Sequence, residues 1–137
     1  MPDDMDISFV VPCDDIRRED NGKLIAIGLY GENLTIRKAP LQMPMSFIIW
    51  ANANEISDYE ADIEIFLEPE KSAVARLKFG FSAGEKSKRI AIPIPAISLN
   101  IGGPGALVMR QKIVEGEKEV LRLPILRGEP NVSPPPS

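Results

Sequence analysis

One short segment near the N-terminus brings together side chains that could do chemistry. Cys13, Asp14, Asp15 and Arg17 lie close together, and Lys23 follows shortly after them. A thiol beside two carboxylates could form a reactive or binding site, but a cysteine nucleophile needs a nearby base. The simpler interpretation is structural: one aspartate caps a short helical turn, Arg17 pairs with one of the two, and Cys13 is a small buried residue. We expect the structural interpretation.

The composition removes most catalytic chemistry. The chain of 137 residues has no histidine and a single cysteine. This excludes serine–histidine and cysteine–histidine catalysis, haem held by histidine, zinc held by histidine or by cysteine pairs, and an intrachain disulfide. A carboxylate pair could still hydrolyse a glycoside, but nothing in the sequence selects the pair. We therefore expect a protein without enzymatic activity and without a cofactor.

Aspartates are numerous enough to raise calcium as a ligand, because sandwich loops can supply several carboxylates to this ion. No loop has the alternating acidic spacing with glycine and glutamate that makes calcium binding specific. We therefore expect surface acidity and no metal. The aspartates concerned are Asp3, Asp4, Asp6, Asp14, Asp15, Asp20, Asp58 and Asp62.

Hydrophobic and polar residues alternate with a period of two along most of the chain, which is typical of half-buried strands. No long stretch has a helical period, and only short helical turns at 14–19 and 56–60 fit the pattern. The spacing predicts an all-β fold, an antiparallel Greek-key β-sandwich that is jelly-roll-like or Ig/C2-like, with nine or ten strands. We expect one domain over residues 1–128 and an extended proline-rich tail over 129–137. The expected strands are 5–11, 23–30, 34–36, 45–56, 63–67, 75–79, 90–94, 107–113 and 121–125.

The same pattern predicts positions within the sandwich. Residues 23–30 (KLIAIGLY) are apolar on both faces, as in a central strand. Pro93 and Pro95 assign their strand to an edge or a bulge, because proline cannot donate to a ladder. The predicted core consists of Ile27, Phe47, Ile49, Ile65, Leu77, Phe79, Ile92, Met109 and Leu123.

Residues 68–72 are expected to form the loop of a hairpin. Counting outward from Leu67 opposite Ala73 sets Glu64 opposite Arg76 and Asp62 opposite Lys78, with the isoleucines on the other face. Opposite charges directly across the strands favour this register.

Charge is distributed unevenly: residues 1–70 carry 15 acidic and 5 basic side chains, and residues 71–127 carry 4 acidic and 11 basic ones. Either acidic strands pair with basic ones within a sheet, or the molecule is dipolar and stacks head to tail or presents a basic face to an anionic partner. A three-residue loop at 115–117 would set Arg110 opposite Arg122, with Lys112 on the same face. A carboxylate from residues 55–70 must then separate these cations, or they bind an anion. We expect the carboxylate.

The segment Phe9–Gly31 resembles a family of small, uncharacterised bacterial and phage proteins. Their N-terminus has a strand, then Cys/Ala-Asp-Asp-Ile/Val-Arg, then Gly-Lys and a strand that ends in Ile-Gly-x-Tyr. A proline-rich loop that leads into an apolar strand, here Pro40–Trp50, is similar too. The resemblance covers about the first third of the chain; it implies a β-sandwich and no particular activity. The matching residues are Cys13, Asp14, Asp15, Ile16, Arg17, Gly22, Lys23, Ile27, Gly28 and Tyr30.

The N-terminal residues are acidic and lack the apolar block of a secretory signal, and no apolar run is long enough to span a membrane. We therefore expect a cytoplasmic protein with no membrane association. We expect it to act through protein–protein contact or self-assembly, with a protein partner or as a homo-oligomer, as an accessory bacterial or phage protein. The alternative is a binding module for an anionic ligand (a nucleotide, a nucleic acid or a phosphorylated molecule) on strands of the basic C-terminal half.

Overall fold

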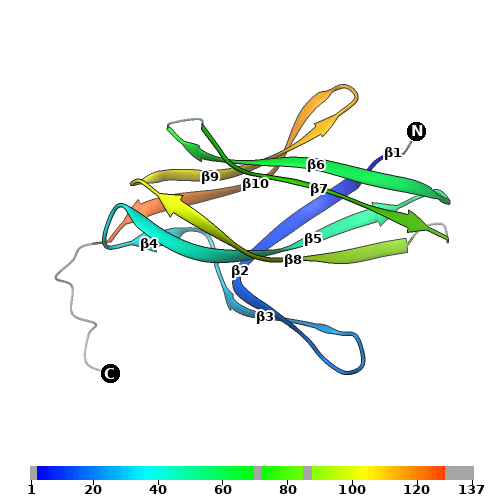
Figure 1. Ribbon diagram of the computed structural model, residues 1–137, viewed down its shortest axis with the longest axis horizontal. Helices are drawn as coiled ribbons and strands as arrows, with labels where there is room; N and C mark the ends of the chain where they lie inside the picture. Colours follow the sequence, from blue (N-terminus) through cyan, green and yellow to red (C-terminus); the bar gives the residue numbers. More distant parts are fainter. Residues whose placement is uncertain (1–2, 70–71, 85–87, 129–137) are drawn as a thin grey trace.

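The computed structural model describes residues 3–69, 72–84 and 88–128, which form ten strands in two sheets that face each other (Figure 1). Sheet A has the order β7-β6-β9-β10-β4, with β1 also beside β6, and sheet B has the order β3-β2-β5-β8. The tail expected over 129–137 lies outside the described residues. The strands are β1 (Asp3–Asp4), β2 (Asp6–Arg18), β3 (Leu24–Leu29), β4 (Leu34–Ile36), β5 (Leu41–Ala53), β6 (Ser57–Glu68), β7 (Ser72–Ala83), β8 (Lys88–Ile101), β9 (Gly105–Ile113) and β10 (Gly116–Arg127).

Sheet B is antiparallel, as expected, whereas sheet A is mixed. β1 pairs with β6 in parallel, and so does β4 with β10. The expectation of an antiparallel fold is therefore wrong for sheet A. β1 and β4 are short segments whose neighbours along the chain (β2, β3 and β5) belong to sheet B. Each joins sheet A without a hairpin that would impose an antiparallel direction.

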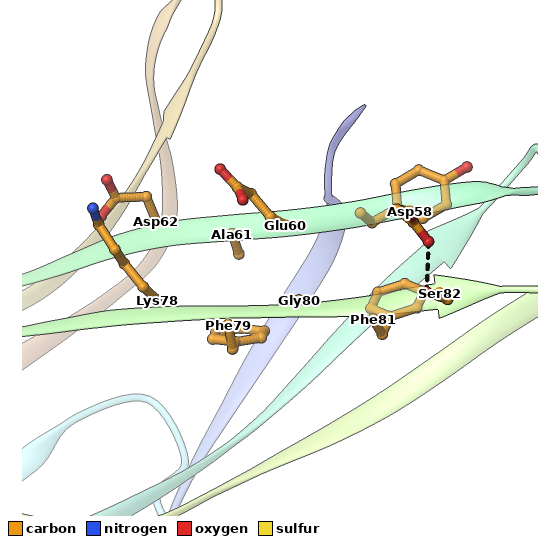
Figure 2. A pocket seen from close by; sticks show the side chains of 10 residues that line it. Asp58, Glu60, Ala61, Asp62, Lys78, Phe79, Gly80, Phe81 and Ser82 are labelled. Carbon is orange, nitrogen blue, oxygen red and sulfur yellow. Dashed lines mark hydrogen bonds between the residues drawn. The ribbon is translucent and has the colours of Figure 1, made fainter. Parts of the chain in front are cut away.

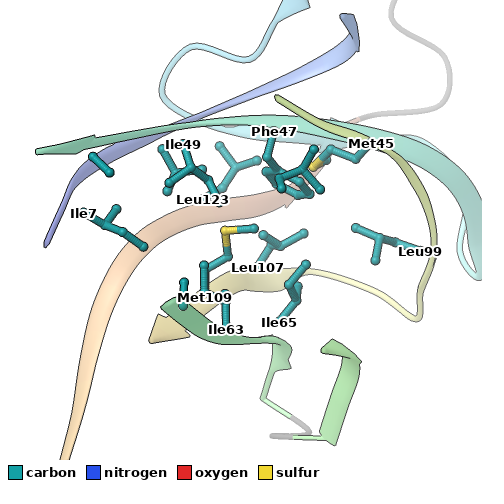
Figure 3. Close-up of a cluster of buried hydrophobic side chains, with 14 of the residues drawn as sticks. Ile7, Met45, Phe47, Ile49, Ile63, Ile65, Leu99, Leu107, Met109 and Leu123 are labelled. Atoms are coloured by element: carbon teal, nitrogen blue, oxygen red, sulfur yellow. The ribbon is translucent and has the colours of Figure 1, made fainter. Parts of the chain in front are cut away.

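The core lies between the sheets and comes from alternate residues of the strands (Figure 3). In β6, Ile63 and Ile65 are fully buried, while the intervening Glu64 is only partly buried. Ile27, however, is 43% exposed, so its prediction as a core residue is wrong. Of the other predicted core residues, Phe47, Ile49, Ile65, Met109 and Leu123 are buried, and Leu77, Phe79 and Ile92 are partly buried against the cluster.

Three local predictions have different outcomes. The expected central strand at 23–30 is β3, an edge strand whose one partner among the described residues is β2. Both expected helical turns are wrong, because β2 continues through residues 14–18 and β6 begins at Ser57. The backbone of residues 15–18 is instead used in the ladder with β3. The expectation for Pro93 and Pro95 is confirmed, because β8 is the other edge strand of sheet B.

The predicted β6–β7 register is confirmed over most of its length. Glu64 lies opposite Arg76, and Asp62 lies opposite Lys78. The register fails only near the loop, where Leu67 lies opposite Ser72 and not Ala73, because a bulge follows Ile65. A bulge inserts one extra residue, which a count outward from the loop cannot anticipate.

The N-terminal segment joins the two sheets, because β1 belongs to sheet A and β2, only one residue later, belongs to sheet B. Met5, between them, is buried, and its backbone N–H donates to the carbonyl of Glu60 at 3.0 Å. The buried Gln111 donates from Nε2 to the Met5 carbonyl at 2.7 Å, and Lys118 Nζ donates to the Ile7 carbonyl at 2.9 Å. Side chains of sheet A thus hold the backbone at the crossing.

Candidate functional site

The hairpin that carries the predicted anion site has a different turn from the expected one. Ile113 lies opposite Gly116, so the loop contains the two residues 114–115 and not 115–117. A bulge between Glu119 and Leu121 then shifts β10 by one residue. Leu121 lies opposite Met109 and Leu123 opposite Leu107, two residues from the pairing that a loop at 115–117 would give. A two-residue loop alone would set apolar residues of one strand opposite charged residues of the other, and the bulge restores apolar partners beyond Val120.

This register changes the surroundings of the three cations. Arg110 lies opposite Glu119, and Arg122 lies opposite Val108. The predicted juxtaposition of Arg110 with Arg122 is therefore wrong. Both arginines and Lys112 still share the outer face of sheet A. On β9, Met109 and Gln111 on either side of Arg110 are buried, so Arg110 and Lys112 face outward. Arg122 lies opposite Val108, which shares the face of Arg110.

Carboxylates accompany each of the three cations. Arg122 bonds Glu68 at 2.6 Å and Glu119 at 2.8 Å, and these two bonds raise the pKa of the guanidinium above its ordinary value. Lys112 Nζ lies 4.0 Å from Glu64, and Arg110 lies 3.8 Å from Glu117. Glu64 and Glu68 belong to residues 55–70, the expected source of the compensating charge.

These pairs follow a pattern that extends across sheet A. The basic strand β7 lies beside the acidic outer face of β6, and β6 lies beside the basic face of β9. Arg76 donates to Asp62 in a bidentate pair at 3.0 and 2.7 Å. Arg110 also lies over the ring of Phe66, 5.9 Å from its centroid. The interpretation that acidic strands pair with basic ones is confirmed, and it accounts for the charge asymmetry of the sequence.

A shallow hollow lies on the outer face of β6 and β7 (Figure 2). Gly80 faces Glu60 across the ladder and has no side chain to fill the space. Asp58 accepts a hydrogen bond from Ser82 at 2.5 Å, and Asp62 is held by Arg76. Both carboxylates are thus used in pairing the strands, and the hollow has the character of an acidic surface.

The Cys13–Lys23 motif lies within the β2–β3 hairpin and not at a strand end. Arg17 Nε donates to Asp15 at 3.2 Å, as expected, but no helical turn is capped there. Cys13 is completely buried, and burial, followed by the charges of Asp14 and Asp15, raises the pKa of its thiol. A raised thiol pKa opposes thiolate formation, so the geometry does not favour a cysteine nucleophile. At the turn, the N–H of Lys23 donates to Asn21 Oδ1 at 3.0 Å.

Asp14 performs a structural task in this motif. Its carboxylate accepts a hydrogen bond from the Tyr30 hydroxyl and lies against Gly28 on the neighbouring strand. Burial of the Tyr30 ring and this bond raise the pKa of the phenol above its ordinary value. The motif residues Asp14, Gly28 and Tyr30 therefore fix the β2–β3 hairpin.

The feature that the sequence reasoning missed is an apolar surface on sheet B. The rings of Phe9 and Trp50 stack with their centroids 5.8 Å apart, and Phe9 is exposed. Beside them, a hollow is lined by Leu24, Ala26, Ile48, Trp50 and Ala91, together with Arg18, Gly22 and Lys23. On the other side of β3 from Leu24 and Ala26, the side chains of Ile25, Ile27 and Leu29 are also exposed. The available signal was the apolar run 23–30, which the sequence reasoning placed in the interior.

Over residues 3–69, 72–84 and 88–128, no group of three or more Asp, Glu, Cys or His side chains is arranged to hold a metal ion. The same ranges contain no helix of the length and apolarity needed to cross a bilayer.

Comparison with protein-family models finds no matching family. Comparison with curated proteins finds no match either. The resemblance of Phe9–Gly31 to small bacterial and phage proteins remains a prediction. Residue chemistry and the geometry of the surface therefore carry the functional argument.

Proposed function

We propose that this protein is a non-catalytic β-sandwich that acts through protein–protein contact, with self-assembly as its principal form. The observation that carries the proposal is the exposure of apolar side chains on β3 and on the adjoining outer face of sheet B. Apolar side chains gathered on a surface favour association, because their burial removes apolar area from water. The charged outer face of sheet A, by contrast, is largely compensated within the chain.

The anion-binding alternative has less support. Each of Arg110, Lys112 and Arg122 lies near at least one carboxylate of the same chain. An anion would have to displace these carboxylates or accept their repulsion, and both cost binding free energy.

Two measurements distinguish the two functions. Light scattering at low and high salt determines the molar mass, and thermal melting with and without inorganic phosphate reports anion binding. We expect an assembly whose mass does not change with salt, because apolar contacts are not screened. We also expect no increase in melting temperature with phosphate. A monomer that phosphate stabilises would contradict the proposal and favour the anion-binding module.

We further propose a Greek-key arrangement of the jelly-roll-like or Ig/C2-like kind, and an accessory role in the cytoplasm of a bacterium or in a phage. The arrangement is supported by the path from β5 to β8. The hairpin β6–β7 lies in sheet A, while β5 and β8, which flank it along the chain, pair with each other in sheet B. A Greek key similarly returns the chain beside the strand from which it left.

A further inference from the structure

The open edge of β3 differs from the other edges that the structure describes. β4 and β1 have only three and two residues, β8 contains Pro93 and Pro95, and β7 presents Arg76 and Lys78. Short length, proline and outward charge all discourage the addition of another strand. The six residues Leu24–Leu29 contain neither a proline nor a charge. β3 therefore has the composition of a strand that is paired on both sides.

The side chains of β3 present an apolar row. Ile25, Ile27 and Leu29 are 41%, 43% and 63% exposed, whereas Leu24 and Ala26 are more buried. Alternate residues of a strand share a face, so the three exposed side chains lie on one side of β3. Figure 1 shows the β2–β3 hairpin extending away from the body of the sandwich.

The backbone of β3 is also available for pairing. The N–H of Glu19 donates to the carbonyl of Lys23 at 2.8 Å, so the bonding groups of Lys23 point toward β2. Backbone groups of successive residues point to opposite sides of a strand. The N–H and C=O groups of Leu24 and Ala26 therefore point to the open edge.

We infer, on the basis of the proposed function, that β3 pairs in antiparallel orientation with β3 of a second copy of this chain, about a two-fold axis at Ile27. This register sets Ile27 opposite Ile27 of the second copy, and Ile25 opposite Leu29. Ala26 then lies opposite Gly28. The N–H of Gly28 points to the open edge, because the alternation from Lys23 directs the carbonyl of Ile27 toward β2, so this N–H can donate to the Ala26 carbonyl of the second copy. The alternation ends at Gly28, whose φ is +70°, and the N–H of Tyr30 donates to the Pro12 carbonyl on β2 at 3.2 Å. The three exposed side chains of both copies meet on one face, and the two four-stranded sheets B become one continuous eight-stranded sheet.

Charge at the ends of the strand favours a second copy in this orientation. Lys23 precedes β3 and Glu32 follows it, and both are exposed. An antiparallel pair brings the positive end of one copy near the negative end of the other, whereas a parallel pair would bring like charges together. The chain is thus complementary to itself at this edge.

The two-fold axis provides a specific test, because residue 27 of one copy meets residue 27 of the other. Ile27→Lys sets two positive charges against each other, and Ile27→Glu sets two negative ones. We expect each variant alone to have half the molar mass of the parent by light scattering, and an equimolar mixture to recover the parent mass. Leu126→Lys changes a comparably exposed residue of β10 and is expected to keep the parent mass. Circular dichroism checks that every variant keeps its sheet structure.

The outcomes separate this pairing from the broader proposal of self-assembly. A parent that assembles while both Ile27 variants also assemble overturns the β3 pairing and leaves self-assembly intact. Two monomeric variants whose mixture stays monomeric overturn the two-fold register. A monomeric parent overturns both the pairing and self-assembly.

Discussion

Gly28 occupies a backbone conformation and a space that a side chain cannot share. Its φ is +70°, and a Cβ at this position would clash with the carboxylate of Asp14. Gly28→Ala should therefore combine backbone strain with displacement of the carboxylate that Tyr30 holds. We expect the free energy of unfolding, measured by urea titration, to fall by about 1–3 kcal/mol.

Gly22 provides a matched control, because its φ is +87° but the space around it is open. Gly22→Ala should show the cost of backbone strain alone. The difference between the two variants then measures the contact with Asp14. Equal losses would contradict the structural role that we assign to Asp14.

Asp62 should make the free energy of unfolding depend on pH. The hydrogen bonds from Arg76 hold the pKa of this carboxyl below its usual value, although partial burial opposes them. A lowered pKa contributes stability that is present above the unfolded value of about 3.9 and is lost as the pH falls through the folded value. Asp62→Asn should therefore be less stable than the parent at pH 6, and the difference should shrink toward pH 3.

Urea titrations at several pH values measure this difference. The Arg76→Gln background provides the control, because it removes the cause of the lowered pKa. In that background, Asp62→Asn should have a smaller effect at pH 6. A difference between Asp62→Asn and the parent that does not vary with pH would contradict the assignment.

At the level of strands, the alternation of apolar and polar residues correctly predicted burial and register where a strand is regular. β6 alternates without interruption from Ala61 to Ile65, and both its burial and its pairing with β7 follow the prediction. β10 contains a bulge at Val120, which turns the pattern by one residue and leaves no mark in a two-residue period. The Arg110–Arg122 juxtaposition failed because the loop lies at 114–115 and not at 115–117, which sets Arg110 opposite Glu119 before the bulge is reached. The compensating glutamates of β6, by contrast, were anticipated from charge.

Leu123 and Leu126 test the facing of β10. They lie on the same strand, but Leu123 is buried and Leu126 is 48% exposed. Leu123→Ala should lower the free energy of unfolding by about 2–5 kcal/mol, because it leaves a cavity between the sheets. Leu126→Ala should change it by less than about 0.5 kcal/mol. If Leu123→Ala and Leu126→Ala lowered the free energy of unfolding by similar amounts, in thermal and in urea unfolding, the assignment of Leu123 to the core face of β10 would be wrong.

At the scale of the whole molecule, the alternation of apolar and polar residues does not indicate how many strands pair with a given strand. The run 23–30 is apolar on both faces, and the prediction of a central strand assumed that its second neighbour lies in the same chain. In the described fold β3 is at an edge and Ile27 is exposed. A second copy on that edge would reconcile the sequence pattern with the structure. The candidate surface was missed because the apolar pattern of a strand is the same whether its second neighbouring strand belongs to the same chain or to a second copy.

The N-terminal segment, where the chain passes from sheet A to sheet B at Met5, allows a test of what holds the two sheets together. Met5 is buried between the sheets, whereas Asp3 and Asp4 of β1 are exposed. They pair with β6 through the backbone, and their carboxylates accept hydrogen bonds from Ser57 and from the N–H of Val114. Met5→Ala should lower the free energy of unfolding by about 2–5 kcal/mol, the cost of truncating a buried methionine. Deletion of residues 1–4 keeps Met5 and its bond to Gln111, so it should cost less.

Urea unfolding of the two variants gives the comparison, and circular dichroism checks that both retain the sheets. A deletion that costs more than Met5→Ala would mean that β1 contributes more to closure of the sandwich than the buried side chain does. In that case sheet A would depend on its parallel edge pair. The order we expect instead places the stabilisation in apolar contact between the sheets, because burial of a large side chain outweighs a few exposed backbone hydrogen bonds.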